Sequence, residues 1–212
     1  MIFLAFSCNL FSQVRSLFMK TDEKGQPVTS FSDNRIMEDV RDGRVEKLAL
    51  LFERHHVMMF NFFLRLSGSR EASEDLVQEV FLRILKYRKT FQGQSKFTVW
   101  MYQIARNVHI DHLRKRGDLV SLDDQFEEAA SPEISPLESL GRDQEAALLR
   151  RALDRLPVKK REILILSRFQ DMKYKDLAEL FGCRVGTIKS HVHRAIKDLS
   201  EIYRELQGGT VS

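Results

Sequence analysis

Cysteine and proline are scarce in this chain, and their scarcity narrows the classes of protein to which it can belong. Cys8 and Cys183 are the only cysteines among 212 residues, so a disulfide framework is excluded and a reducing compartment, the cytoplasm, is expected. Only four prolines and ten glycines interrupt the chain. Because apolar residues recur at helical spacing along most of the sequence, we predict an all-α protein.

The chain also lacks a long uninterrupted apolar run. Residues 1–20 are apolar and rich in phenylalanine, but polar residues interrupt the run and no basic residue precedes Arg15. A membrane-spanning helix needs about 20 mostly apolar residues, and a signal peptide begins with a basic segment. We therefore expect no stable membrane insertion. Residues 1–36 are expected to form a leader outside the folded domains, and a mis-set start codon, with Met19 or Met37 as the true beginning, would explain it.

Residue patterns that mark an enzyme are missing as well. The sequence contains no nucleophile with a recognisable base, no carboxylate dyad and no glycine-rich phosphate loop. Four histidines leave open a metal-dependent phosphohydrolase, but no third ligand lies at workable spacing from either pair: His55 with His56, and His109 with His112. We predict a protein that is not an enzyme and binds neither a metal nor a cofactor.

The composition is otherwise that of a globular protein, with 43% hydrophobic and 30% charged residues. A net charge of +4 permits nucleic acid as a partner without requiring it. Residues 118–144 depart from this composition. They contain many acidic residues and a single basic residue, Arg142, and two prolines would interrupt a helix. Such a segment is typical of a flexible linker. The sequence therefore predicts two small helical domains at 37–117 and 145–206, followed by a tail at 207–212.

The C-terminal part of the chain has the pattern of a helix-turn-helix. The first helix would begin at Tyr174, and Gly182 can adopt the left-handed conformation that ends it. From Val185 onward apolar residues recur every three or four positions, so one face of the second helix is buried. The opposite face carries Thr187, Lys189, Ser190, His193, Arg194 and Lys197. In a helix-turn-helix this face enters the major groove of DNA, although helical hairpins with a solvated basic face also occur without a DNA partner.

Further basic residues precede this hairpin. A helix is expected over 145–156, and Pro157 suits the first turn of the next one. We expect positive charge near the phosphate path from Lys159, Lys160, Arg161 and Arg168.

The first domain is expected to contain a long apolar helix that ends near Ser67, followed by a second helix capped by Ser73. The outer face of that second helix carries Asp75, Gln78, Glu79 and Leu82. An exposed leucine among polar residues is compatible with a docking surface and equally with an ordinary solvated face.

A loop at 89–96 and a helix at 97–116 complete the first domain. Aromatic residues in this segment are interleaved with lysines and arginines. Aromatic rings beside cations suit a nucleic-acid strand whose bases have left the duplex, because stacking contributes roughly 1 to 3 kcal/mol per base. For Trp100 a place in the core is the expected role.

Three segments resemble the extracytoplasmic-function (ECF) group of bacterial RNA polymerase sigma factors. Residues 186–195, GTIKSHVHRA, are similar to the promoter-reading helix of these factors. Residues 74–81, EDLVQEVF, look like the helix that docks on the β′ clamp helices of core polymerase. The segment 89–116 is similar to the region that captures the minus-10 promoter element, with the loop forming a pocket for a flipped base. The resemblance covers roughly 37–206.

The resemblance implies a non-catalytic subunit that binds core RNA polymerase and directs it to promoters. Residues that would contact the minus-35 element are Arg184, Thr187, Lys189, Ser190, His193, Arg194 and Lys197. Residues that would contact the minus-10 element are Phe91, Gly93, Gln94, Ser95, Lys96, Arg106, Asn107 and Arg114. Residues that would bind core polymerase are Asp75, Gln78, Glu79 and Leu82. The implied partners are promoter DNA, the β′ clamp helices and β flap of core polymerase, and an anti-sigma factor.

A LuxR-type regulator is the competing interpretation. Such regulators carry a similar Gly-Thr-aliphatic-Lys-Ser run in their helix-turn-helix but have no polymerase-docking helix. A LuxR-type protein would bind duplex promoter DNA by itself, whereas a sigma factor is expected to bind promoters weakly without polymerase.

Overall fold

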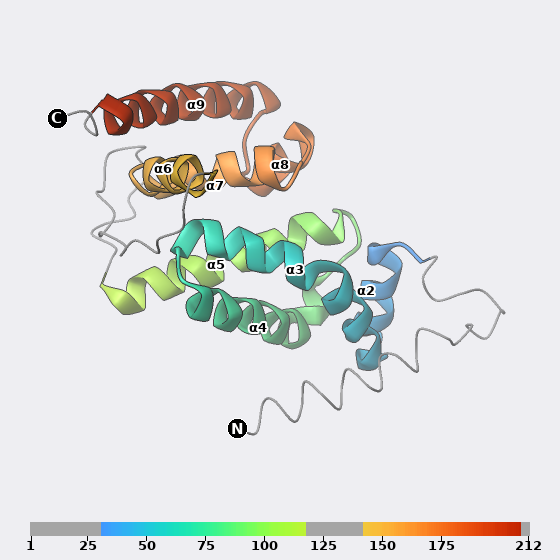
Figure 1. Ribbon diagram of the computed structural model, residues 1–212. Helices are drawn as coiled ribbons and strands as arrows, with labels where there is room; N and C mark the ends of the chain where they lie inside the picture. Colours follow the sequence, from blue (N-terminus) through green and yellow to red (C-terminus); the bar gives the residue numbers. More distant parts are fainter. Residues whose placement is uncertain (1–30, 118–141, 209–212) are drawn as a thin grey trace. The chain divides into compact units, whose positions relative to one another are not determined.

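The computed structural model describes residues 31–117 and 142–208, and these residues form helices and connecting turns without a β-strand. The helices in chain order are α2 (Asp33–Arg41), α3 (Leu48–Ser67), α4 (Arg70–Tyr87), α5 (Phe97–Arg116), α6 (Arg142–Asp154), α7 (Val158–Leu164), α8 (Tyr174–Leu180) and α9 (Val185–Gly208) (Figure 1). Short 3₁₀ turns at Val45–Lys47 and Arg88–Thr90 precede α3 and follow α4, and a π turn at Ile165–Phe169 extends α7. The predicted all-α class is confirmed. The predicted linker lies outside the described residues, except that its last positions begin α6.

The chain divides into two compact units. The first contains the described residues up to Val57 together with Gln78–Ile104, and the second contains Met58–Val77 together with the described residues from Ala105 onward. These boundaries differ from the predicted domains at 37–117 and 145–206, because α3, α4 and α5 each contribute residues to both units.

Helix α2 begins at Asp33, inside the segment 1–36 that the sequence assigned to a leader. Ser32 caps it, since the Ser32 hydroxyl oxygen accepts a hydrogen bond from the Arg35 backbone N–H at 3.3 Å. On the inner face of the helix Ile36, Met37 and Val40 are fully buried. The alternative start at Met37 therefore falls within a buried turn of α2 rather than at the edge of the fold.

Ion pairs at both ends of α2 fix it within the first unit. Asp33 accepts hydrogen bonds from Arg54 at 2.6 Å and from His55 Nε2 at 2.8 Å, and both partners lie on α3. At the other end of the helix, buried Asp39 pairs with Arg44 and, at 2.6 Å, with Lys47. Each end of α2 is thus attached to the residues that follow it in the chain.

The start of α4 differs from the prediction. The helix begins at Arg70, so Ser73 lies inside it, where its side chain is buried and its hydroxyl donates to the Ser69 carbonyl. Ser69 takes the capping role instead, because its hydroxyl oxygen accepts from the Ala72 N–H at 3.2 Å. Ser69 follows Gly68, whose positive φ of 67° lets the chain leave α3.

The second unit is organised around α9, which packs against α6, α7 and α8 (Figure 1). Its core is formed by apolar residues of these helices and of the turn between α6 and α7: Ala152, Leu153, Leu156, Ile163, Leu164, Leu177, Ala178, Leu180, Ile188, Val192 and Ala195. The same unit includes the ends of α3 and α5 that carry Leu66 and Val108, which are also buried. The helix-turn-helix is therefore supported by a well-packed apolar core.

Candidate nucleic-acid interface

The turn between α8 and α9 has the geometry expected for a helix-turn-helix. Gly182 adopts a left-handed conformation with φ of 61°. The Gly182 N–H donates to the Glu179 carbonyl at 3.2 Å, and the Cys183 N–H donates to the Ala178 carbonyl at 2.9 Å. This pair of bonds is a Schellman motif, which ends α8 and lets α9 begin three residues later. The predicted role of Gly182 is confirmed, and small Ala178 is buried beside the turn.

The outer face of α9 is accessible along its N-terminal half. All the residues predicted to contact the minus-35 element are exposed: Arg184, Thr187, Lys189, Ser190, His193, Arg194 and Lys197. Within the described ranges, no ion pair neutralises Arg184, Lys189 or Arg194. The face therefore presents free cations and hydroxyl groups, as binding to phosphates and base edges requires.

Two of the four basic residues before the hairpin do not supply the free positive charge that we expected near the phosphate path. Arg161 is 4% exposed and does not face solvent. Its guanidinium donates to the carbonyls of Asp154 at 2.5 Å and Leu66 at 3.0 Å, so it is a structural residue rather than a phosphate contact. Lys160 pairs with Asp198 on α9 at 2.6 Å, which offsets its charge.

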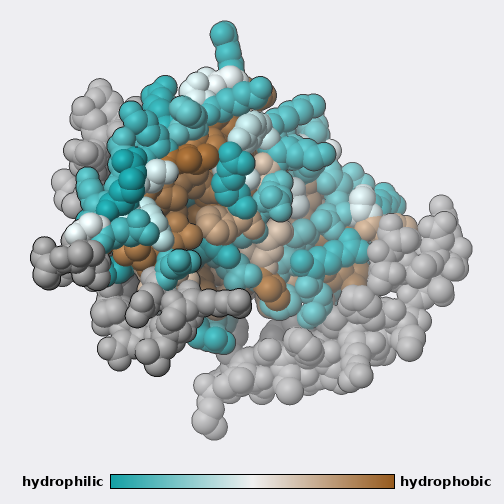
Figure 2. Space-filling model, turned by 45° about the horizontal axis from the view of Figure 1, so that its top comes forward, coloured by the Kyte–Doolittle hydropathy of each residue, from teal (hydrophilic) through white to brown (hydrophobic). Residues whose placement is uncertain are grey.

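Helix α4 carries the predicted polymerase-docking residues. Asp75, Gln78 and Leu82 are exposed, and the Leu82 side chain is 53% accessible. Glu79 is half-buried and accepts a hydrogen bond from Arg83 Nε at 2.7 Å. On the face of the molecule drawn in Figure 2, hydrophobic residues (brown) are visible between hydrophilic residues (teal). The large apolar residues exposed in the described part of the chain are Val45, Val57, Leu82, Tyr87, Phe169, Val185 and Ile196.

The segment that we name the capture loop, residues 91–96, connects the turn after α4 to α5. Phe91, at its start, is 1% exposed, and its ring packs edge-on against Trp100 at 5.3 Å and near Phe97 at 6.4 Å. The Phe91 ring is therefore not available to stack on a base in this structure, in contrast to the role that the resemblance implies. Gln94 and Lys96 point outward and are exposed.

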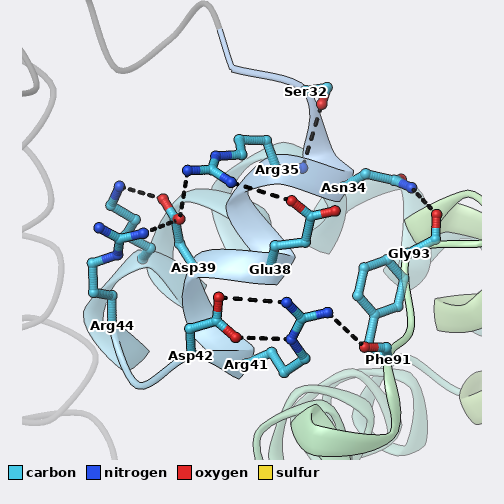
Figure 3. Close-up of polar contacts among 11 residues, drawn as sticks. Ser32, Asn34, Arg35, Glu38, Asp39, Arg41, Asp42, Arg44, Phe91 and Gly93 are labelled. Carbon is cyan, nitrogen blue, oxygen red and sulfur yellow. Dashed lines mark hydrogen bonds and ion pairs between the residues drawn. The ribbon is translucent and has the colours of Figure 1, made fainter. Parts of the chain in front are cut away.

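Two residues of α2, Asn34 and Arg41, form hydrogen bonds with the backbone of the capture loop (Figure 3). The Asn34 side-chain amide donates to the Ser95 carbonyl at 2.9 Å and lies 3.5 Å from the Gly93 carbonyl, while its oxygen accepts from the Phe97 N–H at 2.7 Å. Arg41 Nη1 donates to the Phe91 carbonyl at 3.3 Å. A Cβ placed on Gly93, whose φ is 73°, would lie 3.0 Å from the Glu38 carboxylate.

Sequence reasoning missed Asn34 because it assigned 1–36 to a leader, and it gave no role to Glu38 and Arg41, which lie inside the predicted first domain. Asn34 falls in that range, and it lies three residues before the first expected domain boundary at 37. The signal that could have found it is the Ser32-Asp33 pair, a helix-capping sequence directly before the apolar residues Ile36, Met37 and Val40. That pattern predicts a helix start at Asp33.

On α5 the predicted minus-10 residues differ in exposure. Asn107 and Arg114 are exposed, but the Arg106 side chain is only 16% accessible. Its guanidinium pairs with Glu162 at 2.8 Å and lies over the Phe181 ring at 4.1 Å. Burial raises the pKa of the Glu162 carboxyl, while Arg106 beside it acts in the opposite direction. A DNA contact by Arg106 therefore requires the loss of this ion pair.

Two of the histidines form hydrogen bonds within the fold. His55 pairs with Asp33, and His56 Nδ1 lies 2.9 Å from the Phe52 carbonyl. His109 is 3% exposed, and burial, with smaller effects of Arg161 and His112, lowers its pKa to about 3. Among the described residues, no group of three or more histidines, cysteines or acids is arranged to hold a metal ion. Over the same residues, every helix is too short or too polar to cross a bilayer.

Two family models match the chain in series. Sigma-70 region 2 matches residues 51–118, and sigma-70 region 4 matches residues 146–199. The first contains α4 and the capture loop, and the second contains the helix-turn-helix. A region 2 followed by a region 4 defines a transcription initiation factor of the sigma-70 type.

Curated relatives narrow this class. The chain is 35% identical over 142 residues to the ECF RNA polymerase sigma factor EcfG of Rhodopseudomonas palustris, a match that covers 66% of this chain and 76% of EcfG. It is 28% identical over 188 residues to the RNA polymerase sigma-H factor of Pseudomonas aeruginosa, covering 84% of this chain and 97% of that factor. The chain belongs to the ECF sigma factors. It is therefore a non-enzymatic factor that directs promoter-specific transcription, and the LuxR-type alternative is not supported.

Solved structures agree with this fold. The sigma factor RpoE of Bartonella quintana, in complex with the anti-sigma factor NepR, matches with a TM-score of 0.55 and 29% identity over 73% of this chain and 95% of that one. CnrH, in complex with the cytosolic domain of CnrY, matches with a TM-score of 0.63 and 20% identity over 82% of this chain and 97% of that one. At 20% identity the second match supports the fold alone.

Proposed function

We propose that this sigma factor docks on core RNA polymerase through α4, reads the minus-35 element with α9 and captures the minus-10 element with the capture loop and α5. The observation that supports the proposal most directly is the exposure of every predicted minus-35 residue. Arg184 directly precedes α9, and the others lie on the outer face of α9, opposite a fully buried stripe. A helix with one buried face and one free basic face is suited to enter a major groove.

At the minus-35 element, cations and hydroxyl groups of α9 contact duplex DNA. Lysine and arginine donate to guanine or to phosphate oxygens, and each good base contact contributes about 1 to 3 kcal/mol of discrimination. Ser190 donates its hydroxyl hydrogen to the Gly186 carbonyl at 3.1 Å, so its oxygen remains free to accept a hydrogen bond from a base amino group.

At the minus-10 element, the protein binds bases that have left the duplex. Gln94 and Lys96 of the capture loop and Asn107 of α5 are exposed and carry the donors and acceptors for this contact. Phe91 does not stack on a base; its buried ring packs against Phe97 and Trp100 and supports the loop. Strand opening needs no catalytic residue, because binding of the unstacked bases offsets an unstacking cost of a few kcal/mol.

The proposed function also defines the partners and the compartment. Core polymerase would contact the exposed face of α4 at Asp75, Gln78 and Leu82, with Glu79 beside them. The Bartonella quintana relative is bound to an anti-sigma factor, so we infer that a protein of this kind holds the present chain inactive. A sigma factor acts where its polymerase acts, which places the protein in the cytoplasm.

Run-off transcription tests the proposal. Bacterial core polymerase would transcribe fragmented genomic DNA with and without the protein, and the starts would be mapped. We expect new starts that share two spaced motifs. With a core that is active in the presence of a known sigma factor, the absence of protein-dependent starts would contradict the proposal.

A pair of variants tests docking through α4. We expect Leu82→Glu to weaken binding to core polymerase at least about tenfold, because a charge replaces an exposed apolar contact. Val57→Glu places the same charge on another exposed apolar residue, on α3, and should bind core like the unaltered protein. If Leu82→Glu and Val57→Glu bind core polymerase equally well, Leu82 does not take part in docking.

A further inference from the structure

The match to sigma-70 region 2 assigns no role to α2, because it begins at residue 51, after α2 has ended. The contacts between α2 and the capture loop suggest one. Asn34, Glu38 and Arg41 follow one another at spacings of four and three residues, so they lie on one face of α2. Asn34 and Arg41 donate hydrogen bonds to the loop backbone, and Glu38 lies where a Cβ on Gly93 would meet it. The opposite face of the helix, with Ile36, Met37 and Val40, is buried in the core.

We infer that α2 is a clamp for the capture loop and that Asn34 is its central positioning residue, which holds Gln94 and Lys96 ready for an unpaired base of the minus-10 strand. This inference rests on the proposed function of the loop. Asn34 itself does not contact DNA; it acts through the loop backbone.

The chemistry of Asn34 fits this role. Its side-chain oxygen accepts the Phe97 N–H, one of the amide groups at the start of α5 that lack a partner within the helix. Its amide nitrogen donates to the Ser95 carbonyl and faces the Gly93 carbonyl. Only a side chain with both a donor and an acceptor can join the helix start to the loop in this way.

The two ends of the loop are held from the same helix. Arg41 donates to the Phe91 carbonyl at the start of the loop and also pairs with Asp42 at 2.9 Å, which orients its guanidinium (Figure 3). Between these anchors the loop turns at Gly93, where the absence of a side chain lets the backbone pass close to Glu38.

A loop fixed in this way binds its target with less loss of conformational entropy than a mobile one. A free segment of polar residues around Gly93 would have to become ordered each time it captured a base. The clamp therefore predicts that Asn34 affects selectivity for the captured base more than it affects the stability of the unit.

Asn34→Asp is the sharpest variant. The carboxylate keeps the shape of the side chain and still accepts from the Phe97 N–H, where the start of α5 favours a negative charge. It cannot donate to the carbonyls of Gly93 and Ser95. The matched control is Asn61→Asp on α3, whose side chain makes no hydrogen bond to the described residues.

The measurement uses the full chain assembled with core polymerase and a promoter mapped by run-off transcription. Fluorescence anisotropy would give the affinity for a labelled single-stranded oligonucleotide that carries the minus-10 motif, and for oligonucleotides in which each base is replaced in turn. We expect Asn34→Asp to weaken binding of the intact motif about tenfold and to abolish most of the preference at the base on which the unaltered protein depends.

A second set of readouts separates positioning from the added charge. Repulsion between Asp and phosphates would weaken all oligonucleotides equally and would fade at higher salt, whereas lost positioning removes the base preference at both salt concentrations. Gly93→Ala should reproduce the lost preference from the loop side, because its Cβ would meet Glu38 in a backbone conformation that alanine rarely adopts.

The outcomes distinguish the inference from the proposed function. If the unaltered protein gives no promoter-dependent starts, the proposed function fails. A second outcome is that the unaltered protein gives promoter-dependent starts while Asn34→Asp and Gly93→Ala show the same base preference as the control Asn61→Asp. In that case the inference that α2 clamps the loop is wrong, and the proposed function stands. Loss of preference in both variants, with core binding unchanged, supports the clamp.

Discussion

His109 on α5 illustrates how burial changes the charge state of a single side chain. Its ordinary pKa is near 6.5, and burial, with Arg161 and His112 nearby, lowers it to about 3 in the folded chain. Between these values the unfolded chain binds a proton that the folded chain does not. The stabilisation is therefore complete above about pH 6.5 and is lost as the pH falls toward 3.

We expect His109→Gln to flatten the pH dependence of stability in this range. For unaltered protein this histidine contributes a slope of up to about 1.4 kcal/mol in the free energy of unfolding per pH unit. Urea denaturation at pH 7, 6 and 5 would compare the two proteins. His193→Gln is the control, because His193 is exposed on α9 and should leave the slope unchanged. Identical slopes for His109→Gln and unaltered protein would contradict this account.

Arg194 and Arg204 test the proposed DNA face of α9 at single-residue resolution. Both arginines are exposed on the same helix, ten residues apart, but only Arg194 lies on the proposed reading face. We expect Arg194→Ala to weaken binding to a minus-35 duplex by about tenfold and Arg204→Ala to have a smaller effect, because a base or phosphate contact contributes about 1 to 3 kcal/mol. Electrophoretic mobility shifts of holoenzyme on the mapped promoter would measure both.

At the scale of an element, the turn between α8 and α9 depends on the backbone conformation of one residue. Gly182 has a φ of 61° and nothing within 4 Å of a Cβ placed on it, so a substitution there is opposed by strain rather than by a clash. Gly186 lies within α9 in ordinary helical conformation and is equally open. The two glycines therefore separate backbone strain from side-chain packing.

We expect Gly182→Ala to destabilise the second unit by about 1 to 2 kcal/mol, the cost of a left-handed alanine. Gly186→Ala should instead stabilise α9 by up to about 1 kcal/mol, because alanine loses less entropy in a helix. Thermal unfolding followed by circular dichroism would show opposite shifts of the midpoint. Shifts in the same direction for both variants would rule out the strain explanation.

At the scale of the whole molecule, Arg161 joins parts of the second unit that are distant in sequence. Its guanidinium reaches the Leu66 carbonyl, 95 residues earlier, and the carbonyls of Asp154 and Leu156. Burial lowers the pKa of Arg161, while Asp154 favours its charged form. The residue satisfies the carbonyls at the ends of two helices at once, which makes it a determinant of how this unit closes.

We expect Arg161→Met to destabilise the protein by about 2 to 4 kcal/mol, because it leaves several buried carbonyls without a donor. Arg151→Met, on the exposed surface of α6, should change stability by less than about 0.5 kcal/mol. Urea denaturation at neutral pH would compare the two. A small effect of Arg161→Met would show that water replaces the guanidinium and that the closure does not depend on it.

Much of the fold could be predicted from the sequence because helix formation is a local property. The predicted helix at 97–116 has the bounds of α5, and the turn at Gly182 lies where the sequence places it. The start of α4 could not be predicted as well, because Ser69 and Ser73 are both good caps and the buried position of Ser73 depends on packing. The faces of α4 and α9 followed from helical periodicity and a family resemblance.

The sequence by itself determined the helices from α3 onward, their order and the family, since periodicity, capping and motif spacing are carried by neighbouring residues. Only the tertiary structure decided which polar and aromatic side chains the core encloses. Phe91 and Arg161 are buried although their residue types also suit a nucleic-acid surface. The clamp at Asn34 depends on a hydrogen bond to Ser95, 61 residues away, and no local pattern encodes the approach of two segments that meet only when the chain is folded.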